Sequence, residues 1–446
     1  MKSNFSTNTI NILFVELSIT TLIQFLLARL YVDNAVKVNF IFLDNANFPQ
    51  LAYKRTLAQV LVGLKLIYSL DTFLYSRRRS KSNKTYKNLD FFSIAGIIDN
   101  NLTHSLNGIF SRRPKHLKKT ISCLTHHGAS DGLRILDISS KSDFYFIYNA
   151  RYCYSRALIE TLRLNNINPY VTERTVTLKG KFQYFCSEAD IFDPFPFVME
   201  STKQFARLPP EQHLDLCSFY DHKLDFSNKD SFYCTSLLQK NNPLFSIENK
   251  LYDILYLTTS LDETVGLVGT SRNSIVRHEL KTLAVLQQLS SHGLRIAVRY
   301  HPNLKNKSKE DKSFWAHLSK KYIESLIDVY SYDSPYTSYQ LIGKSSLVVT
   351  NGSTIGAEAS YLGKKSVSFL PNTWPELTGC QIYVSIQNDV IDKIFDILYK
   401  QEFHRPTIRQ FAAFAYLQIG MGYSVDELIL HFIKSLFKPI SVNSSS

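Results

Sequence analysis

Several short motifs that would assign a chemistry directly are missing from this sequence of 446 residues. Its six cysteines are scattered, with no C-x-x-C pair and no zinc-type spacing, which favours reduced thiols in a cytoplasm. No glycine-rich dinucleotide fingerprint follows the first expected strand at residues 10–16, so a nicotinamide enzyme is disfavoured. No solenoid-type repeat is present.

A long apolar run is also missing. The most apolar N-terminal stretch, residues 10–30, contains Glu16, Gln24 and several Ser and Thr residues, and it has no basic leader or small-residue cleavage site. We therefore expect neither a signal peptide nor a membrane span there. With 44% hydrophobic and 20% charged residues, the composition is globular, and the length is sufficient for two cores.

The charge is strongly unbalanced, at +13, which predicts an anionic partner such as a nucleotide, an acidic glycan, lipid headgroups or nucleic acid. Basic residues concentrate in two segments, 77–87 and 112–119. These are either solvated loops or sites attracted to an anionic membrane, at about 1 kcal/mol per basic residue. Neither segment is interleaved with aromatics in the pattern of a known nucleic-acid-binding motif, so nucleic acid is not expected as a partner.

The order of expected strands and helices predicts an α/β protein of two doubly wound domains that face a central cleft. We place an acceptor domain at residues 1–245, a nucleotide-donor domain at 246–400, and C-terminal helices with a polar tail at 401–446. Residues 176–248, with prolines at 194, 196, 209 and 210, are expected to form loops and short helices that lead into an interdomain linker near 240–250.

A phosphate-binding turn is predicted after the β-branched run at residues 347–350. Gly352 allows close backbone approach, and the hydroxyls of Ser353 and Thr354 can donate to phosphate oxygens at the start of a helix over 354–362. Alternatively, Ser353 or Thr354 is only a helix N-cap.

A second such point follows the expected strand at 294–300, which Pro302 ends. His301 then lies at the carboxyl end of a strand, where open α/β sheets bind ligands, and Arg299 adds charge if its side chain faces the same way. The alternative is that His301 is a structural residue.

Four motifs together resemble a known family. They are Tyr148-Asn149-Ala150-Arg151 with Thr172-Glu173-Arg174, Thr258-Thr259-Ser260-Leu261-Asp262-Glu263, Arg299-Tyr300-His301-Pro302-Asn303, and Gly352-Ser353-Thr354-Ile355-Gly356-Ala357-Glu358-Ala359. Over about residues 143–370, the chain is similar to bacterial capsule and surface-polysaccharide glycosyltransferase-like proteins, related to sialyl- and Kdo-transferases. Ala150 stands where the family usually has Gly, which is expected to alter a turn, and Lys365 where a Pro is common, which is expected to be harmless.

The resemblance implies the GT-B fold, with the donor nucleotide bound mainly by the C-terminal domain. It implies donor contacts from Arg299, His301, Asn303, Gly352, Ser353 and Thr354, and further cleft residues Asn149, Arg151, Arg174, Ser260 and Asp262. Glu358 would accept from the ribose hydroxyls, or else it only compensates the helix N-terminus. Inverting chemistry is expected, with the nucleotide-sugar as substrate and no separate cofactor.

The catalytic base is left open among Glu173, His127 and Glu263, each of which is alternatively a structural or solvated residue. No D-x-D triplet occurs, so no metal site is predicted. The resulting hypothesis is a cytoplasmic glycosyltransferase, peripheral at the inner face of the membrane, that extends a surface polysaccharide or lipid-linked glycan. The alternatives are a CDP-polyol phosphotransferase of the same fold and a non-catalytic partner in polysaccharide binding or export.

Overall fold

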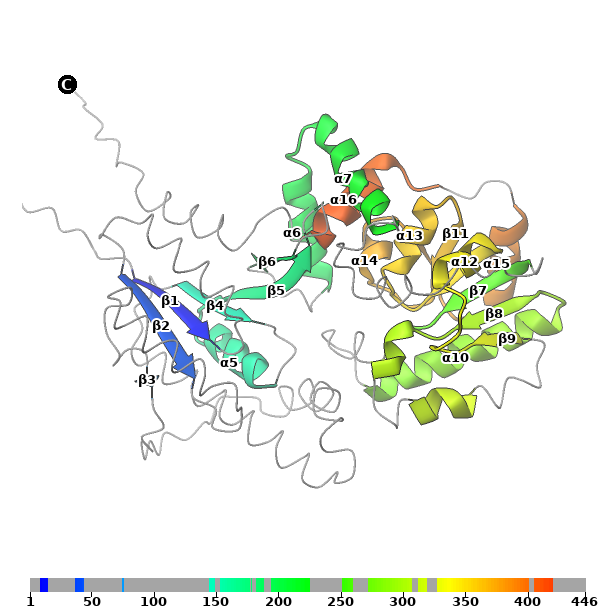
Figure 1. Cartoon of the computed structure of the whole chain (residues 1–446), viewed down its shortest axis with the longest axis horizontal. Helices are drawn as coiled ribbons and strands as arrows, with labels where there is room; N and C mark the ends of the chain where they lie inside the picture. The colour runs from blue at the N-terminus through cyan, green and yellow to red at the C-terminus, as the bar shows by residue number, and fades with distance from the viewer. Residues whose placement is uncertain are drawn as a thin grey trace, which may run out of the picture.

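Two six-stranded sheets form the framework of the protein (Figure 1). The computed structural model describes residues 9–14, 37–43, 74–75, 144–148, 153–176, 178, 182–187, 194–224, 251–259, 272–306, 312–318, 327–400 and 405–419. All structural statements below concern these residues.

The first sheet has the strand order β3-β2-β1-β4-β5-β6. Strands β1 to β5 pair in parallel, while β6 returns antiparallel along β5. Helix α5 (Cys153–Leu164) connects β4 to β5 and buries Leu158, Ile159 and Leu162. The strands are β1 (Thr9–Phe14), β2 (Lys37–Leu43), β3 (Leu74–Tyr75), β4 (Phe144–Tyr148), β5 (Tyr170–Val176) and β6 (Phe182–Ser187).

The second sheet is parallel throughout, in the order β12-β11-β10-β7-β8-β9. Leu257 pairs with both Thr350 and Arg299, so strands β7, β8 and β10 reach their carboxyl ends at the same level. The strands are β7 (Tyr252–Leu257), β8 (Ile296–Arg299), β9 (Ile327–Tyr330), β10 (Ser345–Thr350), β11 (Lys365–Ser368) and β12 (Ile382–Tyr383).

Both sheets therefore follow the doubly wound order 3-2-1-4-5-6, counted within each sheet. The strand order reverses between β1 and β4 in the first sheet and between β7 and β10 in the second. The predicted fold class, α/β with two doubly wound Rossmann-like units, is confirmed. Ligands of such sheets bind outside the carboxyl ends of the strands at this reversal.

Helices cover both faces of the second sheet, and the strand residues alternate between them. Ile254 and Tyr256 pack toward α10 (Arg272–Ser291) and α15 (Val390–Tyr399). Leu255 and Leu257 pack on the other face, toward α12 (Ser338–Gly343) and α13 (Ile355–Tyr361). The short elements η1 (Pro302–Asn306) and α14 (Trp374–Leu377) and the helical residues 312–318 complete this unit.

A third cluster joins helices from distant parts of the chain (Figure 1). Helix α16 (Ile408–Gln418) packs against α6 (Pro194–Phe205) and α7 (Pro210–Leu224). Tyr220 of α7 stacks on Tyr361 of α13 with 4.4 Å between ring centroids, so the cluster is attached to the second sheet's own helices. The domain boundary at residue 245 stays a prediction.

The expectation of loops and short helices over residues 176–248 missed the strand β6, and helices α6 and α7 are longer than expected, at 12 and 15 residues. The prolines misled the prediction because they lie at helix starts. Pro194 and Pro210 are the first residues of α6 and α7, where a missing N–H and a fixed φ are tolerated.

Lys365 has a structural role that the sequence did not indicate. Its Nζ donates to the carbonyls of Ile397, Leu398 and Lys400 at distances of 2.6, 2.9 and 3.2 Å, at the carboxyl end of α15. A cation at this end satisfies terminal carbonyls and opposes the negative end of the helix dipole.

Candidate functional site

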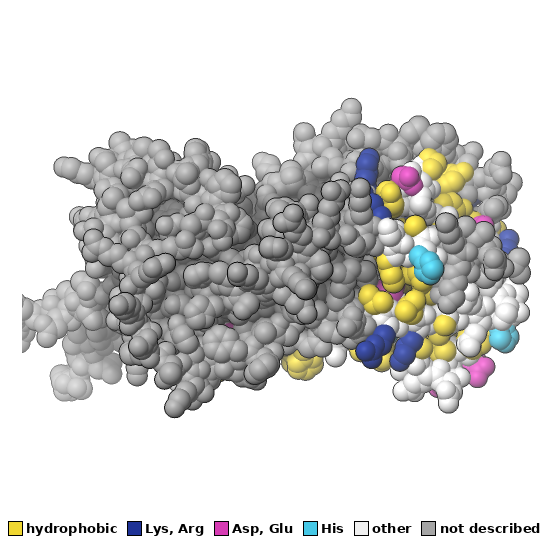
Figure 2. All heavy atoms as spheres, turned by 90° about the horizontal axis from the view of Figure 1, so that it is seen from below, with side chains coloured by type: hydrophobic (Ala, Val, Ile, Leu, Met, Phe, Trp, Pro, Cys, Tyr) yellow, Lys and Arg dark blue, Asp and Glu magenta, His cyan; other side chains and the backbone are white. Residues whose placement is uncertain are grey.

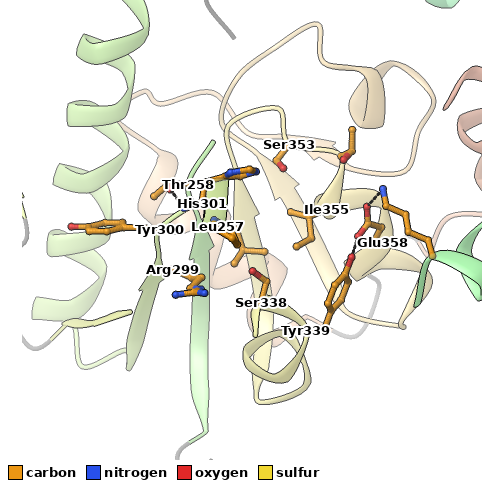
Figure 3. A pocket seen from close by; sticks show the side chains of 13 residues that line it. Leu257, Thr258, Arg299, Tyr300, His301, Ser338, Tyr339, Ser353, Ile355 and Glu358 are labelled. Carbon is orange, nitrogen blue, oxygen red and sulfur yellow. Dashed lines mark hydrogen bonds and ion pairs between the residues drawn. The ribbon is translucent and has the colours of Figure 1, made fainter. Parts of the chain in front are cut away.

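A small polar pocket lies at the carboxyl ends of β7, β8 and β10, where the second sheet reverses its strand order (Figure 3). Its volume is about 50 Å³, roughly enough for three or four water molecules. The predicted residues Arg299, His301, Ser353, Thr354 and Glu358 all line it. Segments that are far apart in sequence thus meet at one point, as the prediction required.

His301 stands directly beyond β8, beside the end of β7. Its backbone N–H donates to Thr258 Oγ1 at 3.0 Å, and Thr258 is buried. Pro302 then begins a 3₁₀ turn, which fixes the direction in which the chain leaves the strand. The imidazole is half-buried and faces the pocket (Figure 3).

Arg299 is the most unusual side chain of the pocket because a charged group is buried there, with 2% of its surface exposed. One terminal nitrogen, Nη1, donates to the carbonyl of Ser331, but Nε has no hydrogen-bond partner among the described residues. No described carboxylate lies within ion-pair distance of the guanidinium. Burial lowers the pKa of Arg299 to about 10, and Asp333 opposes this shift. A buried cation without an ion-pair partner among the described residues would be stabilised by an anion bound beside it.

The turn after β10 supplies hydroxyl groups. Gly352 has φ +85°, and a Cβ there would lie 2.8 Å from Thr373 Cγ2, so both conformation and space require glycine. Thr354 occupies the N-cap position of α13, but its side chain makes no capping hydrogen bond. The alternative that Thr354 serves only as an N-cap is therefore not supported, and both Ser353 and Thr354 border the pocket.

Glu358 forms the opposite wall and is 2% exposed. Its Oε1 pairs with Lys223 Nζ at 2.5 Å, and its Oε2 accepts from Tyr339 Oη at 2.5 Å (Figure 3). Sequence reasoning missed Lys223, which comes from the last turn of α7. Its segment was expected to form loops and short helices, and no motif there indicated a functional residue.

A buried polar network lies beside the pocket. Asn351, which immediately precedes the turn, donates from Nδ2 to Tyr256 Oη, Glu279 Oε1 and Thr282 Oγ1 at 2.8, 2.9 and 3.1 Å. Glu279 is buried, and it also accepts from Tyr256 and Thr259. Burial raises the pKa of Glu279, while the hydrogen bonds from Tyr256, Asn351 and Thr259 act in the opposite direction. The network fixes the strand end from which the turn at 352–354 departs.

The other predicted residues are not among the described residues that line this pocket. Asn149, Arg151, His127, Ser260, Asp262 and Glu263 lie outside the described residues. The backbone positions of Glu173 and Arg174 are on β5 of the first sheet, and that of Asn303 is in η1, next to the pocket residue Pro302. Their roles stay predictions.

The described residues contain neither a metal-type cluster nor a helix that could span a membrane. No group of three or more His, Cys, Asp or Glu side chains is placed to hold a metal ion. No helix within the described ranges is both long and apolar enough for a bilayer crossing. On the face drawn in Figure 2, described Lys and Arg side chains stand at separate places among hydrophobic and polar groups. The basic segments 77–87 and 112–119 are outside the described residues, so their attraction to a membrane stays a prediction.

No known sequence family matches the chain, and no curated protein is significantly similar to it. Among solved structures, it is similar to the β-Kdo 2,4-transferase of Thermosulfurimonas dismutans KpsC, with a TM-score of 0.37, 15% identity, and coverage of 65% of this chain and 86% of that one. It is also similar to the Staphylococcus aureus MnaA–UDP structure, with a TM-score of 0.32, 12% identity and 96% of both chains covered. At these scores the likenesses do not assign an activity, and the fold rests on its own strand orders.

Proposed function

We propose that this protein is a glycosyltransferase that moves a sugar from a nucleotide-activated donor to a surface polysaccharide or a lipid-linked glycan. The observation that carries the proposal is the convergence of the buried Arg299 with His301, Ser353 and Thr354 in the lining of one pocket. This set of groups lies where a doubly wound sheet binds its ligand. Cationic and hydroxyl donors in one small cavity suit a phosphate group.

Transfer of a glycosyl group leaves negative charge on the departing nucleotide phosphate. Donors fixed in a buried pocket stabilise that charge without reorganisation, by about 2 to 4 kcal/mol each where they act chiefly on the transition state. Arg299, His301 and the hydroxyls of the 353–354 turn would provide this stabilisation. In this proposal the nucleotide-sugar is a substrate, the reaction is inverting and metal-independent, and the base is one of His127, Glu173 and Glu263.

In the same proposal the protein works in the cytoplasm, at the inner face of the membrane, with its basic segments near anionic lipid. A glycan or lipid-linked acceptor would enter from the side of the first sheet. Nucleic acid has no part in it.

The substitution His301→Ala tests the function directly. We expect transfer to fall at least 100-fold, since one phosphate donor is removed and a loss of about 3 kcal/mol corresponds to roughly that factor. Replacement of the exposed His317 by Ala is the matched control and should leave activity unchanged. Nucleotide release would be measured with CMP-, UDP-, GDP- and CDP-linked donors.

The same donor panel separates the alternatives. Release of CMP with transfer of a polyol phosphate would identify a phosphotransferase. Glycan binding without turnover of any donor would identify a non-catalytic partner. Full activity of His301→Ala would remove the phosphate role from this pocket.

A further inference from the structure

The pocket has two chemically different ends (Figure 3). Arg299 and His301 stand at the end of β8, and Glu358 and Tyr339 stand across the cavity, with Ile355 between the two groups. A ligand that fills it should present an anion to the first end and hydroxyl groups to the second. The phosphate and ribose of a nucleotide have this arrangement.

Lys223 belongs to the carboxylate end. Its Nζ lies 2.5 Å from Glu358 Oε1, and the two side chains are 10% and 2% exposed. A buried carboxylate is costly to leave without a cationic partner, so the position of the Glu358 side chain depends on Lys223. Tyr339 occupies the other oxygen at 2.5 Å.

The position of Lys223 is itself fixed by packing. Its ammonium lies 5.4 Å from the centroid of the Phe219 ring, one turn earlier on α7. Tyr361 on α13 stacks on Tyr220 and donates to Asp221 Oδ1 at 2.9 Å. The last turn of α7 is thus attached to the helix that carries Glu358, which sets the geometry of the ion pair.

Each carboxylate oxygen can accept two hydrogen bonds. Lys223 and Tyr339 use one position on each oxygen of Glu358, which leaves acceptor capacity for two further donors. The vicinal hydroxyls of a ribose are donors of the right number. A charged acceptor would bind them more tightly than a neutral carboxyl group.

We propose that Lys223 is a positioning residue for recognition of the ribose: through its ion pair it holds the Glu358 carboxylate in the orientation in which it accepts the ligand's vicinal hydroxyls. This inference rests on the proposed function, because it takes the ligand to be a nucleotide. It assigns to helix α7 a part in nucleotide selection, with Lys223 acting through Glu358 and without contact to the phosphate.

The test compares nucleotides with and without the ribose hydroxyls. Calorimetric titration of the full chain with CMP, UDP and GDP and with their 2′,3′-dideoxy counterparts identifies the nucleotide bound most tightly. We expect the unaltered chain to prefer the ribonucleotide over its dideoxy form by roughly 10- to 100-fold, the range for hydrogen bonds to a charged group. In Lys223→Met this preference should fall below about threefold, with dideoxy binding unchanged.

Two further variants keep the experiment decisive. Lys223→Arg, which retains the cation, should keep most of the preference, and Lys203→Met at an exposed position of α6 should keep all of it. If Lys223→Met does not fold, the double variant Lys223→Met/Glu358→Gln is compared with Glu358→Gln alone. Since Lys223 acts through Glu358, these two should show the same ratio of ribo to dideoxy affinity.

Equal weakening of both nucleotide forms in Lys223→Met would overturn the inference, because it would indicate phosphate contact or a purely structural role. An unchanged preference would overturn it as well, and both results would leave the transferase proposal in place. Failure of the unaltered chain to bind any of the nucleotides would remove the proposed function and this inference with it.

Discussion

Replacement of Arg299 by Met should weaken ligand binding without lowering the stability of the protein. The reason is that the buried charge of this guanidinium destabilises the folded chain when no anion is bound. Met keeps an unbranched apolar stem and removes the charge. The substitution takes away the Nε donor that has no partner among the described residues, together with the hydrogen bond from Nη1 to the Ser331 carbonyl. The expected result is loss of anion binding with little or no loss of stability.

The magnitude follows from two opposing contributions. Burial lowers the pKa of Arg299 to about 10, against an ordinary value of about 12.5, which corresponds to about 3 kcal/mol of disfavour for the charged form in the folded state. Because Arg299 is a base with a lowered pKa, this penalty is present at every pH below about 10 and is relieved only above it. Loss of the Ser331 hydrogen bond costs about 1.5 to 3 kcal/mol. We therefore expect the free energy of unfolding to stay unchanged or to rise by up to about 1.5 kcal/mol.

Urea unfolding followed by tryptophan fluorescence provides the assay. The sequence has two tryptophans, and one of them, Trp315, is 2% exposed. Its ring lies 5.0 Å from that of Tyr300, measured between centroids, and Tyr300 directly follows Arg299 in the chain. The signal therefore reports on the second α/β unit. A nucleotide at 100 times its dissociation constant should add about 2.7 kcal/mol to the unaltered chain and almost nothing to Arg299→Met.

The control is Arg299→Lys, which keeps a charge but lacks the forked donor set. It should bind the nucleotide more weakly than the unaltered chain and more tightly than Arg299→Met. The reasoning is refuted if Arg299→Met loses more than about 2 kcal/mol of stability and still gains the full stabilisation from nucleotide. That outcome would make the guanidinium a structural group.

Two more predictions concern the core around the pocket. In Gly356→Ala the added Cβ would lie 2.0 Å from Gln381 Nε2, which donates to Ser366 Oγ at 2.8 Å. The variant should therefore lose about 1 to 3 kcal/mol in urea unfolding, while Gly343→Ala, with no atom within 4 Å of its Cβ, should not; equal midpoints would contradict the packing. For Glu279, the pKa is raised by burial, so the folded state holds the proton more tightly than the unfolded chain, and wild-type stability declines as pH rises above about 4.5. The stability of Glu279→Gln relative to the wild type should therefore increase as pH rises above about 4.5, and a pH-independent difference would show that Glu279 does not titrate as inferred.

Local patterns were sufficient for much of the second unit. The apolar run at 347–350 and the alternation at 294–300 identified β10 and β8, and the turn residues beyond them marked the pocket. These predictions succeeded because the strand period and the turn chemistry are encoded within a few consecutive residues.

Local patterns failed where the deciding contacts are distant in sequence. The prolines of α6 and α7 suggested irregular structure, and only packing against α16 and α13 explains why those helices form. Strand β6 was missed although Phe182, Tyr184 and Phe185 favour a strand, because its segment contains prolines that suggested loops.

The sequence by itself determined the strand ends and the residue types that an anion site needs, namely Arg299, His301 and the 353–354 hydroxyls. Only the tertiary structure decided that the guanidinium is buried without an ion-pair partner among the described residues, and that Lys223 of α7 pairs with Glu358 of α13. The physical reason is that backbone periodicity acts over a few residues, whereas burial and ion pairing depend on which surfaces the folded chain brings together.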